Sequence, residues 1–186
     1  MKVYIKNMVC DRCIMVVKSE FEKHGIHTVT IELGQVELLE DWNDQDKVVL
    51  NTRLIELGFE LLEDKTNSTI ERIKNQIIGL VHHRNLDIKT NLSSYLSENL
   101  AQDYNTLSNL FSDYEGTTIE HFFISQKIEK VKELLSYNEL SLSEIAFKMN
   151  YSDVAHLSNQ FKKVTGITPT NFKKMDKNKR IQIDQL

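Results

Sequence analysis

The first 64 residues alternate short runs typical of strands with amphipathic stretches typical of helices. Residues 2–6 (KVYIK) alternate apolar and polar side chains, as a half-buried strand does. Further β-branched or apolar runs follow at 27–33, 35–40 and 59–64. Apolar residues recur at helical spacing over 13–24 and 44–57, and a glycine follows each stretch, as at a helix C-terminus. The predicted element order is therefore β-α-β-β-α-β.

This order within so short a segment is the pattern of the ferredoxin-like fold, with two helices on one face of an antiparallel sheet. We therefore expect an α+β domain over residues 1–65. Strand character ends near Thr66, and a helix follows in which Ile70, Ile73, Ile77 and Val81 share one side. Ser68 is its expected N-cap. We expect residues 66–85 to be a connector helix or a contact between two copies in a homodimer.

The second half of the chain contains an internal repeat at an offset of 50 residues. Nine of 27 positions are identical, from Leu92 and Leu142 at the start to Thr118 and Thr168 at the end. The shared core reads LSNxFxxxxGxT, in which Leu and Phe share a helix face and the glycine permits the left-handed turn that ends a helix. The sequence thus predicts one helical unit used twice.

Each unit pairs a short amphipathic helix, at about 92–100 or 141–149, with a helix opened by an aspartate cap, Asp103 or Asp153. Two helices joined by so few residues form a helix-turn-helix. From spacing alone, two helical hairpins that merely pack together remain an equally good interpretation.

A longer motif favours DNA binding. Residues 140–174 contain S-x-x-E-I-A, then Y-S-D, then F-K-K-x-x-G-x-T-P-x-x-F-K. This run resembles the signature of AraC-type transcription regulators, and the resemblance extends over about 86–175. It implies an all-α domain of two helix-turn-helix units joined by a long helix, for which 119–135 is the candidate. Residues 176–186 would then form a basic tail.

The match to that family has four departures. Asn150 stands where the family usually has a glycine in the turn, and Lys127 where an arginine is common. Asn109 and Asn159 stand where arginines often reach DNA. The fold prediction is unaffected, but the family's base preferences cannot be transferred to this chain.

In a helix-turn-helix the second helix enters the major groove of double-stranded DNA with its N-terminal residues at the base edges. By matching positions, the expected groove-facing residues are Asn105, Ser108, Asn109, Val154, Ala155, His156 and Asn159. Leu107, Phe111, Leu157 and Phe161 are expected in the core. Asparagine pairs with adenine, whereas Val and Ala can meet a thymine methyl, so the pattern predicts a site rich in A·T.

Lysines near the end of the chain supply candidate phosphate contacts, which position a protein without specifying sequence. They are Lys162, Lys163, Lys173, Lys174 and the basic residues of 177–180. A purely solvated face is the alternative. Residues 1–65 hold 8 Lys and Arg against 13 Asp and Glu, whereas residues 127–186 hold 11 against 7. With a net charge of −4 overall, the balance fits nucleic-acid contact through the C-terminal part only.

The chain has no apolar run near the ~18 residues that span a bilayer, and its start lacks the apolar stretch of a signal peptide. We therefore expect a cytoplasmic protein without a membrane partner. Cysteines in that compartment more often bind metal or do redox work than form structural disulfides. The only two, Cys10 and Cys13, lie in the run MVCDRC after the first strand.

The M-x-C-x-x-C run in this β-α loop resembles the heavy-metal-associated domain of copper chaperones, as does the Gly58-Phe59 pair before the last strand. Thiolates favour soft ions such as Cu(I), Zn or Cd, and a helix N-terminus stabilises a thiolate. Met8 is expected in the core and Phe59 over the site. Asn7 stands where that family usually has glycine. A redox dithiol and two inert cysteines remain alternatives.

The combined hypothesis is a DNA-binding transcription regulator of AraC type that responds to a soft metal ion at Cys10 and Cys13. The metal is not expected to be required for DNA binding. The alternative is a metallochaperone or metal buffer whose helical half docks a protein partner. The sequence contains no Ser-His-Asp, paired-carboxylate or phosphate-loop constellation, so we do not expect an enzyme.

Overall fold

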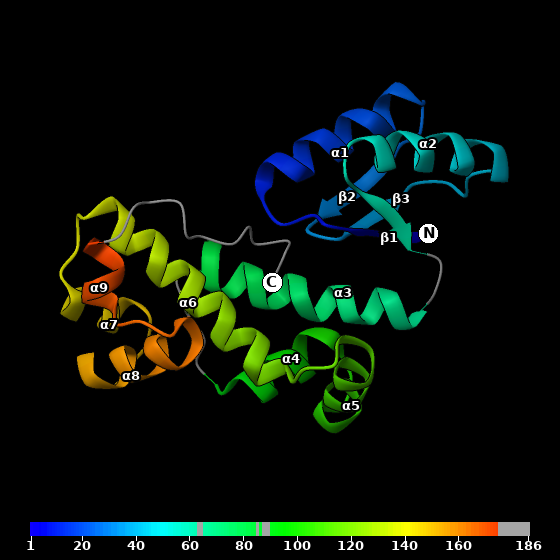
Figure 1. Cartoon of the computed structure of the whole chain (residues 1–186). Coiled ribbons are helices and arrows are strands. Elements are labelled where there is room, and N and C mark those ends of the chain that lie inside the picture. Colours follow the sequence, from blue (N-terminus) through cyan, green and yellow to red (C-terminus); the bar gives the residue numbers. More distant parts are fainter. Residues whose placement is uncertain (63–64, 85, 87–89, 175–186) are drawn as a thin grey trace. The chain divides into compact units, whose positions relative to one another are not determined.

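The computed structural model describes residues 1–62, 65–84, 86 and 90–174, which fold into two compact units (Figure 1). The first unit holds residues 1–79 and 96–110, and the second holds 80–95 and the described residues from 111 onward. The predicted basic tail, 176–186, lies outside the described residues. No helix within the described ranges has the length and apolarity to cross a bilayer.

The first unit contains a four-stranded antiparallel sheet in the order β2-β3-β1-β4. Its strands are β1 (Lys2–Lys6), β2 (Thr28–Glu32), β3 (Gln35–Leu38) and β4 (Glu60–Leu62). Val3 pairs with Val36 and Ile5 with Leu61, so apolar residues of neighbouring strands lie side by side. All four predicted strands are confirmed, each shorter than or equal to its predicted run.

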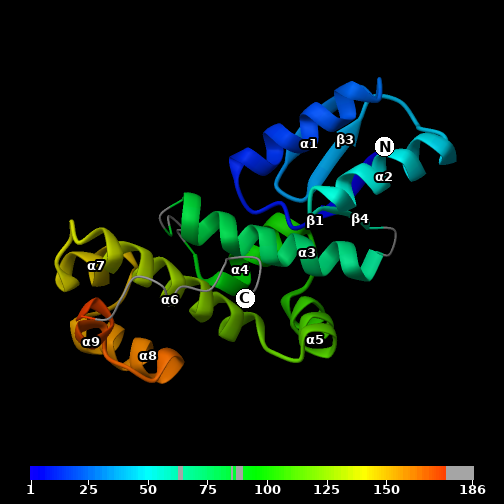
Figure 2. The same cartoon turned by 45° about the horizontal axis from the view of Figure 1, so that its top comes forward.

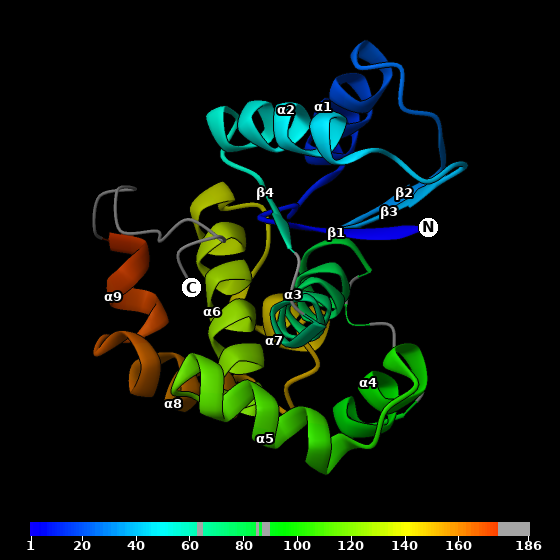
Figure 3. The same ribbon diagram turned by 90° about the vertical axis from the view of Figure 1, so that its right-hand side faces the viewer.

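Two helices, α1 (Asp11–Lys23) and α2 (Asp44–Glu56), cover one face of this sheet (Figures 1 and 3). Each has apolar residues on the side that faces the strands, such as Val17 and Phe21 on α1. Both predicted helices are present in the structure. The resulting core contains Ile5, Met8, Val17, Phe21, Ile26, Val36, Leu38, Leu50, Leu54, Phe59 and Leu61.

The helix α3 (Lys65–Ile78) lies on the opposite face of the sheet (Figure 3). It begins before Ser68, which is buried within the helix, so the prediction of Ser68 as an N-cap is wrong. The guanidinium of Arg72 lies 5.9 Å from the Tyr4 ring centroid, a cation–π contact between helix and sheet. A single π-helical turn, Gly79–His83, then continues α3.

The isoleucine stripe predicted along this helix is buried within the chain. Ile70, Ile73 and Ile77 are each at most 1% exposed, and Val81 is buried as well. A homodimer contact through this helix would therefore have to use other side chains.

The second unit is built on the long helix α6 (Ile119–Tyr137), which begins at a Thr118 cap and ends at Asn138 with φ +58°. This is the predicted joining helix. The helices α7 (Leu142–Lys148), α8 (Val154–Thr165) and α9 (Pro169–Lys174) gather around its C-terminal end (Figure 2). The predicted helix pair of the second repeat is therefore confirmed.

Candidate nucleic-acid interface and thiol site

The first helix-turn-helix unit consists of α4 (Leu92–Leu100) and α5 (Tyr104–Glu115). The turn between them passes through Ala101, whose φ of +53° reverses the chain. Asp103 Oδ1 then accepts hydrogen bonds from the backbone N–H groups of Asn105, at 2.9 Å, and Thr106, at 3.3 Å. The predicted aspartate cap is confirmed, and it fixes where α5 begins.

The second helix-turn-helix starts with a complete capping box, in which Ser141 and Glu144 satisfy each other's backbone N–H groups. The hydrogen bonds from Ser141 lower the pKa of the Glu144 carboxyl. After α7, Asn150 adopts φ +52° and its side-chain Nδ2 donates to Leu86 O at 3.2 Å. This left-handed conformation explains why asparagine can replace the family's usual glycine here.

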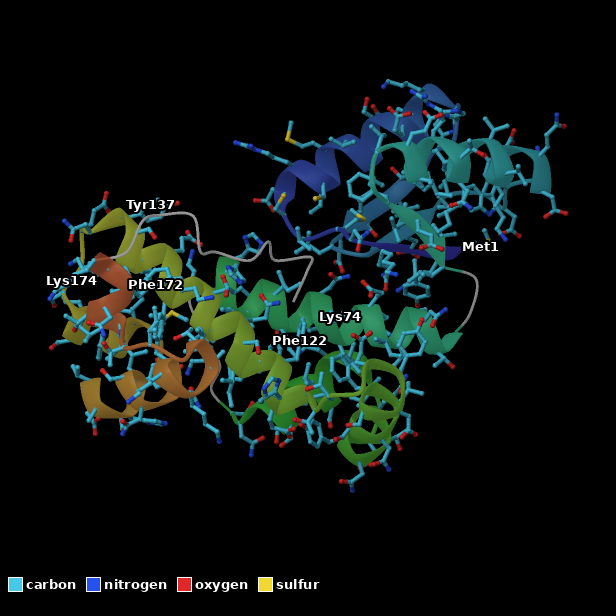
Figure 4. The ribbon with its side chains drawn as sticks, viewed as in Figure 1. Met1, Lys74, Phe122, Tyr137, Phe172 and Lys174 are labelled. Atoms are coloured by element: carbon cyan, nitrogen blue, oxygen red, sulfur yellow. The ribbon has the colours of Figure 1, made fainter. Side chains whose placement is uncertain are left out.

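The second helix of this unit, α8, is held by its apolar side. Leu157 and Phe161 are fully buried, and the Phe161 ring meets Phe172 of α9 edge-on with centroids 5.6 Å apart. Phe172 and the neighbouring Lys174 are labelled on α9 in Figure 4. In the first helix-turn-helix, Leu107 and Phe111 of α5 are likewise fully buried. All four predicted core residues are confirmed, which leaves the opposite side of α5 and α8 for solvent.

The predicted DNA-reading residues lie on that opposite side. Asn105 and Asn109 on α5 are exposed, and Ser108 is half-buried. On α8, Val154 is half-buried, whereas the remaining predicted readers and lysines are exposed: Ala155, His156, Asn159, Lys162 and Lys163. The structure thus brings each predicted set together on one face of one helix, with basic groups beyond the readers on α8.

A group of residues between α6 and α8 was not predicted from the sequence. Lys127 Nζ lies 3.9 Å from the ring centroid of Tyr151, and Tyr151 Oη donates to Gln160 Oε1 at 2.7 Å. Burial lowers the pKa of Lys127 to about 8. Tyr151 is the first residue of the Y-S-D run, so the motif itself was the available signal. The cation–π pair and the hydrogen bond of Tyr151 together connect Lys127 of α6 to Gln160 of α8.

The thiol site is formed where β1 meets α1. Cys10 is the N-cap residue of α1, and its carbonyl accepts from Cys13 N at 2.9 Å, which holds Cys13 in the first helical turn. The two Sγ atoms lie 3.5 Å apart, and both thiols are free and partly exposed. The structure therefore brings the two predicted sulfur donors together.

Asn7 shapes this loop. It adopts φ +68°, and its side-chain Nδ2 donates to Gly58 O at 2.9 Å, which ties the β1–α1 loop to the loop before β4. Cys13 Sγ lies 3.9 Å from Asn7 O. Asn7 thus resembles Asn150, because both asparagines occupy a left-handed position.

The Cys13 thiol has a raised pKa, although it lies in the first turn of α1. Burial raises the pKa of its thiol, and the hydrogen bond with Cys10 raises it further, whereas backbone N–H groups of Val9 and Cys10 lower it. Desolvation thus outweighs the two backbone hydrogen bonds that favour the thiolate. Met8 is fully buried, as predicted, and Phe59 lies in the same core cluster, against which Cys13 packs.

The described residues offer no group of three or more His, Cys, Asp and Glu side chains that could hold a metal ion. His24 caps the far end of α1, where its Nδ1 lies 2.9 Å from Glu20 O. The donor set here is therefore two thiols, which is too few for a closed structural zinc site within this part of one chain.

Comparison with known proteins supports the prediction of helix-turn-helix structure in the C-terminal half. A family model described as a helix-turn-helix domain matches residues 96–175. The chain is 23% identical over 153 residues to YtdP of Bacillus subtilis, an uncharacterized HTH-type transcriptional regulator; the match covers 82% of this chain and 18% of that protein. An uncharacterized HTH-type transcriptional regulator of Staphylococcus aureus is 28% identical over 113 residues, covering 61% of this chain and 14% of the relative.

The chain thus spans less than a fifth of the length of these curated relatives. Among solved structures, the C-terminal domain of AraT, a response regulator from Geobacillus stearothermophilus, shares the fold with a TM-score of 0.50 and 24% identity. That match covers 64% of this chain and 92% of the solved domain. Residues 96–175 of this chain are therefore similar to helix-turn-helix domains, and the matched relatives are named HTH-type transcriptional regulators.

Proposed function

We propose that this chain acts as a sequence-specific transcription regulator that binds double-stranded DNA. The observation that carries the proposal is the two aspartate-capped helices, each with a buried Leu and Phe on one side and exposed polar readers on the other. The matched relatives are named transcriptional regulators, which supports the same function. The expected site is rich in A·T at the positions that the asparagines read.

Fluorescence anisotropy on DNA selected from a random pool tests this proposal. Lys162→Ala weakens binding to all sequences and reduces the salt dependence, because a phosphate contact is lost. Asn159→Ala instead relaxes the preference at one base position. Lys18→Ala, an exposed lysine of the sheet unit, is the matched control and leaves binding unchanged. Selection of G·C-rich sites, or no retention of DNA at low salt, overturns the proposal.

We further propose that residues 1–65 form a ferredoxin-like domain similar to heavy-metal-associated domains. The strand order β2-β3-β1-β4 and the two helices on one face support this fold. The 3.5 Å between Cys10 Sγ and Cys13 Sγ is less than twice a metal–sulfur bond of about 2.3 Å, so both thiolates can reach one ion. Soft thiolate donors suit Cu(I), with Zn and Cd as weaker candidates.

A bound ion would contribute charge that holds both sulfurs as thiolates. Because burial raises the pKa of the Cys13 thiol, loading the site releases protons and is disfavoured in acid. We propose that occupancy changes DNA affinity, which requires that the ion binds the DNA-competent and incompetent states differently.

The test is a Cu(I) titration of the full chain against a chromophoric competitor, followed by DNA binding with and without Cu(I). The Cys10→Ser, Cys13→Ser double variant is expected to lose Cu(I), whereas Met15→Leu, which removes an exposed sulfur from the same helix, keeps it. Wild-type DNA affinity is expected to shift by about fivefold or more with Cu(I). An equal response of wild type and double variant refutes metal sensing and leaves DNA binding intact.

A further inference from the structure

The second recognition helix carries an imidazole whose orientation is fixed by its neighbours. His156 Nδ1 lies 3.1 Å from Ser152 Oγ, and its ring meets Tyr151 edge-on, with centroids 5.2 Å apart and planes at 90°. The backbone N–H of His156 donates to Asp153 Oδ1 at 2.7 Å. The side chain is nevertheless exposed on the reading face of α8. With Nδ1 and the ring face engaged, Nε2 is the ring nitrogen left for a ligand on this exposed face.

The groups around Ser152 favour one tautomer of the His156 ring. Ser152 Oγ donates its single proton to Asp153 Oδ2, at 3.5 Å. In that arrangement the hydroxyl oxygen accepts from His156 Nδ1, and the lone pair of the ring lies on Nε2. The donor chain from imidazole to hydroxyl ends on a carboxylate, which favours this direction.

The first repeat lacks this arrangement. At the offset of 50, Thr106 corresponds to His156, Gln102 to Ser152 and Ala101 to Tyr151. The aspartate cap is retained as Asp103. The two recognition helices thus share their capping chemistry but differ in what they present to a base.

We propose that His156 Nε2 accepts a hydrogen bond from an exocyclic amino group in the major groove, N6 of adenine or N4 of cytosine. This inference rests on the proposed DNA binding. Guanine and thymine present the acceptors O6 and O4 instead, and two facing lone pairs repel. His156 therefore selects an amino base at one position of the site, and Ser152 is the positioning residue that sets its tautomer.

Base analogues test the proposal on the full chain and a selected DNA. Each adenine or cytosine is replaced by purine or 2-pyrimidinone, which lack the amino group, and adenine also by 7-deazaadenine, which keeps it. At one position, loss of the amino group is expected to lower affinity by about three- to tenfold, as one hydrogen bond is worth, and 7-deazaadenine to have no effect. His156→Ala is expected to remove this penalty.

Two further variants separate reading from folding. Thr106→Ala, at the matched position of the first helix-turn-helix, is expected to keep the loss of affinity that removal of the amino group causes. Ser152→Ala is expected to reduce that loss, and Ser152→Thr, which keeps a hydroxyl, to restore it. The inference is overturned, while DNA binding stands, if only 7-deazaadenine lowers affinity at the position read by His156. It is also overturned if His156→Ala still loses affinity when the amino group is removed. If wild type retains no DNA at low salt, the proposed function itself fails, and the inference with it.

Discussion

Acidification should destabilise this protein through one partly buried histidine. His82 lies in the π-helical turn after α3, and its Nε2 is 3.0 Å from Gln126 Oε1 of α6. Burial lowers the pKa of His82 to about 4, against about 6.5 in an unfolded chain. Between these values the unfolded chain binds more protons, so the free energy of unfolding falls as the pH drops from 6.5 toward 4.

The size of the effect follows from the two pKa values. The full loss is about 3 kcal/mol, and the part reached at pH 5 is about 2 kcal/mol. Urea unfolding followed by far-UV circular dichroism at pH 7.5 and pH 5 measures it. His82→Gln, which cannot titrate, is expected to lose about 2 kcal/mol less than wild type over this range.

The neighbouring His83 is exposed and provides the matched control. His83→Gln is expected to keep most of the wild-type dependence on pH, because the His83 charge is the smallest of the causes that shift the pKa of His82. Comparing the pH dependence of each variant, rather than its stability at one pH, removes the packing change that the substitution causes. Identical pH dependence of wild type and His82→Gln would refute the reasoning.

Three further predictions concern core packing, helix capping and a steric clash at a glycine. Phe161→Ala is expected to cost about 3–5 kcal/mol in urea unfolding, whereas Phe147→Ala, at a ring 85% exposed, costs below about 0.5 kcal/mol; similar losses would contradict the assigned core. Asp153→Ala should cost about 1 kcal/mol and Asp153→Asn almost nothing, and equal losses would argue against the cap. Gly34→Ala should destabilise more than Gly25→Ala, because only the first added Cβ meets a side chain, Asn75 Nδ2, at 1.9 Å; the reverse order in thermal melts would exclude the clash.

The sequence predicted the elements well where local chemistry alone decides them. The aspartate at 153, for example, caps its helix wherever that helix packs, and periodicity placed Leu157 and Phe161 in the core without knowledge of their partners. It failed where a contact joins distant residues. Ser68 has the right chemistry for an N-cap, yet α3 begins earlier and packs on the sheet, so tertiary contacts extended the helix past the local signal.

The thiols show the same division. Spacing placed Cys10 and Cys13 together, because Cys10 O and Cys13 N close the first turn of a helix. The direction of the Cys13 pKa depends on burial beside a core assembled from several elements, which no local pattern reveals. The contact of Lys127 with Tyr151 was not predicted either, because the Y-S-D motif marks Tyr151 but not its partner, which lies 24 residues and a whole helix away in sequence.

Asn7 connects the loop that carries the thiols to the loop before β4. Its backbone oxygen lies 3.9 Å from Cys13 Sγ, while its side chain bonds Gly58 next to β4. Strand β4 pairs with β1, and α3 packs against both strands. The helix α3 continues covalently into the turn that carries His82. A path from the thiols to that turn through α3 requires that α3 has two arrangements and that the chain binds the ion with different affinity in each. A metal response by this path therefore depends on α3 as well as on the thiols.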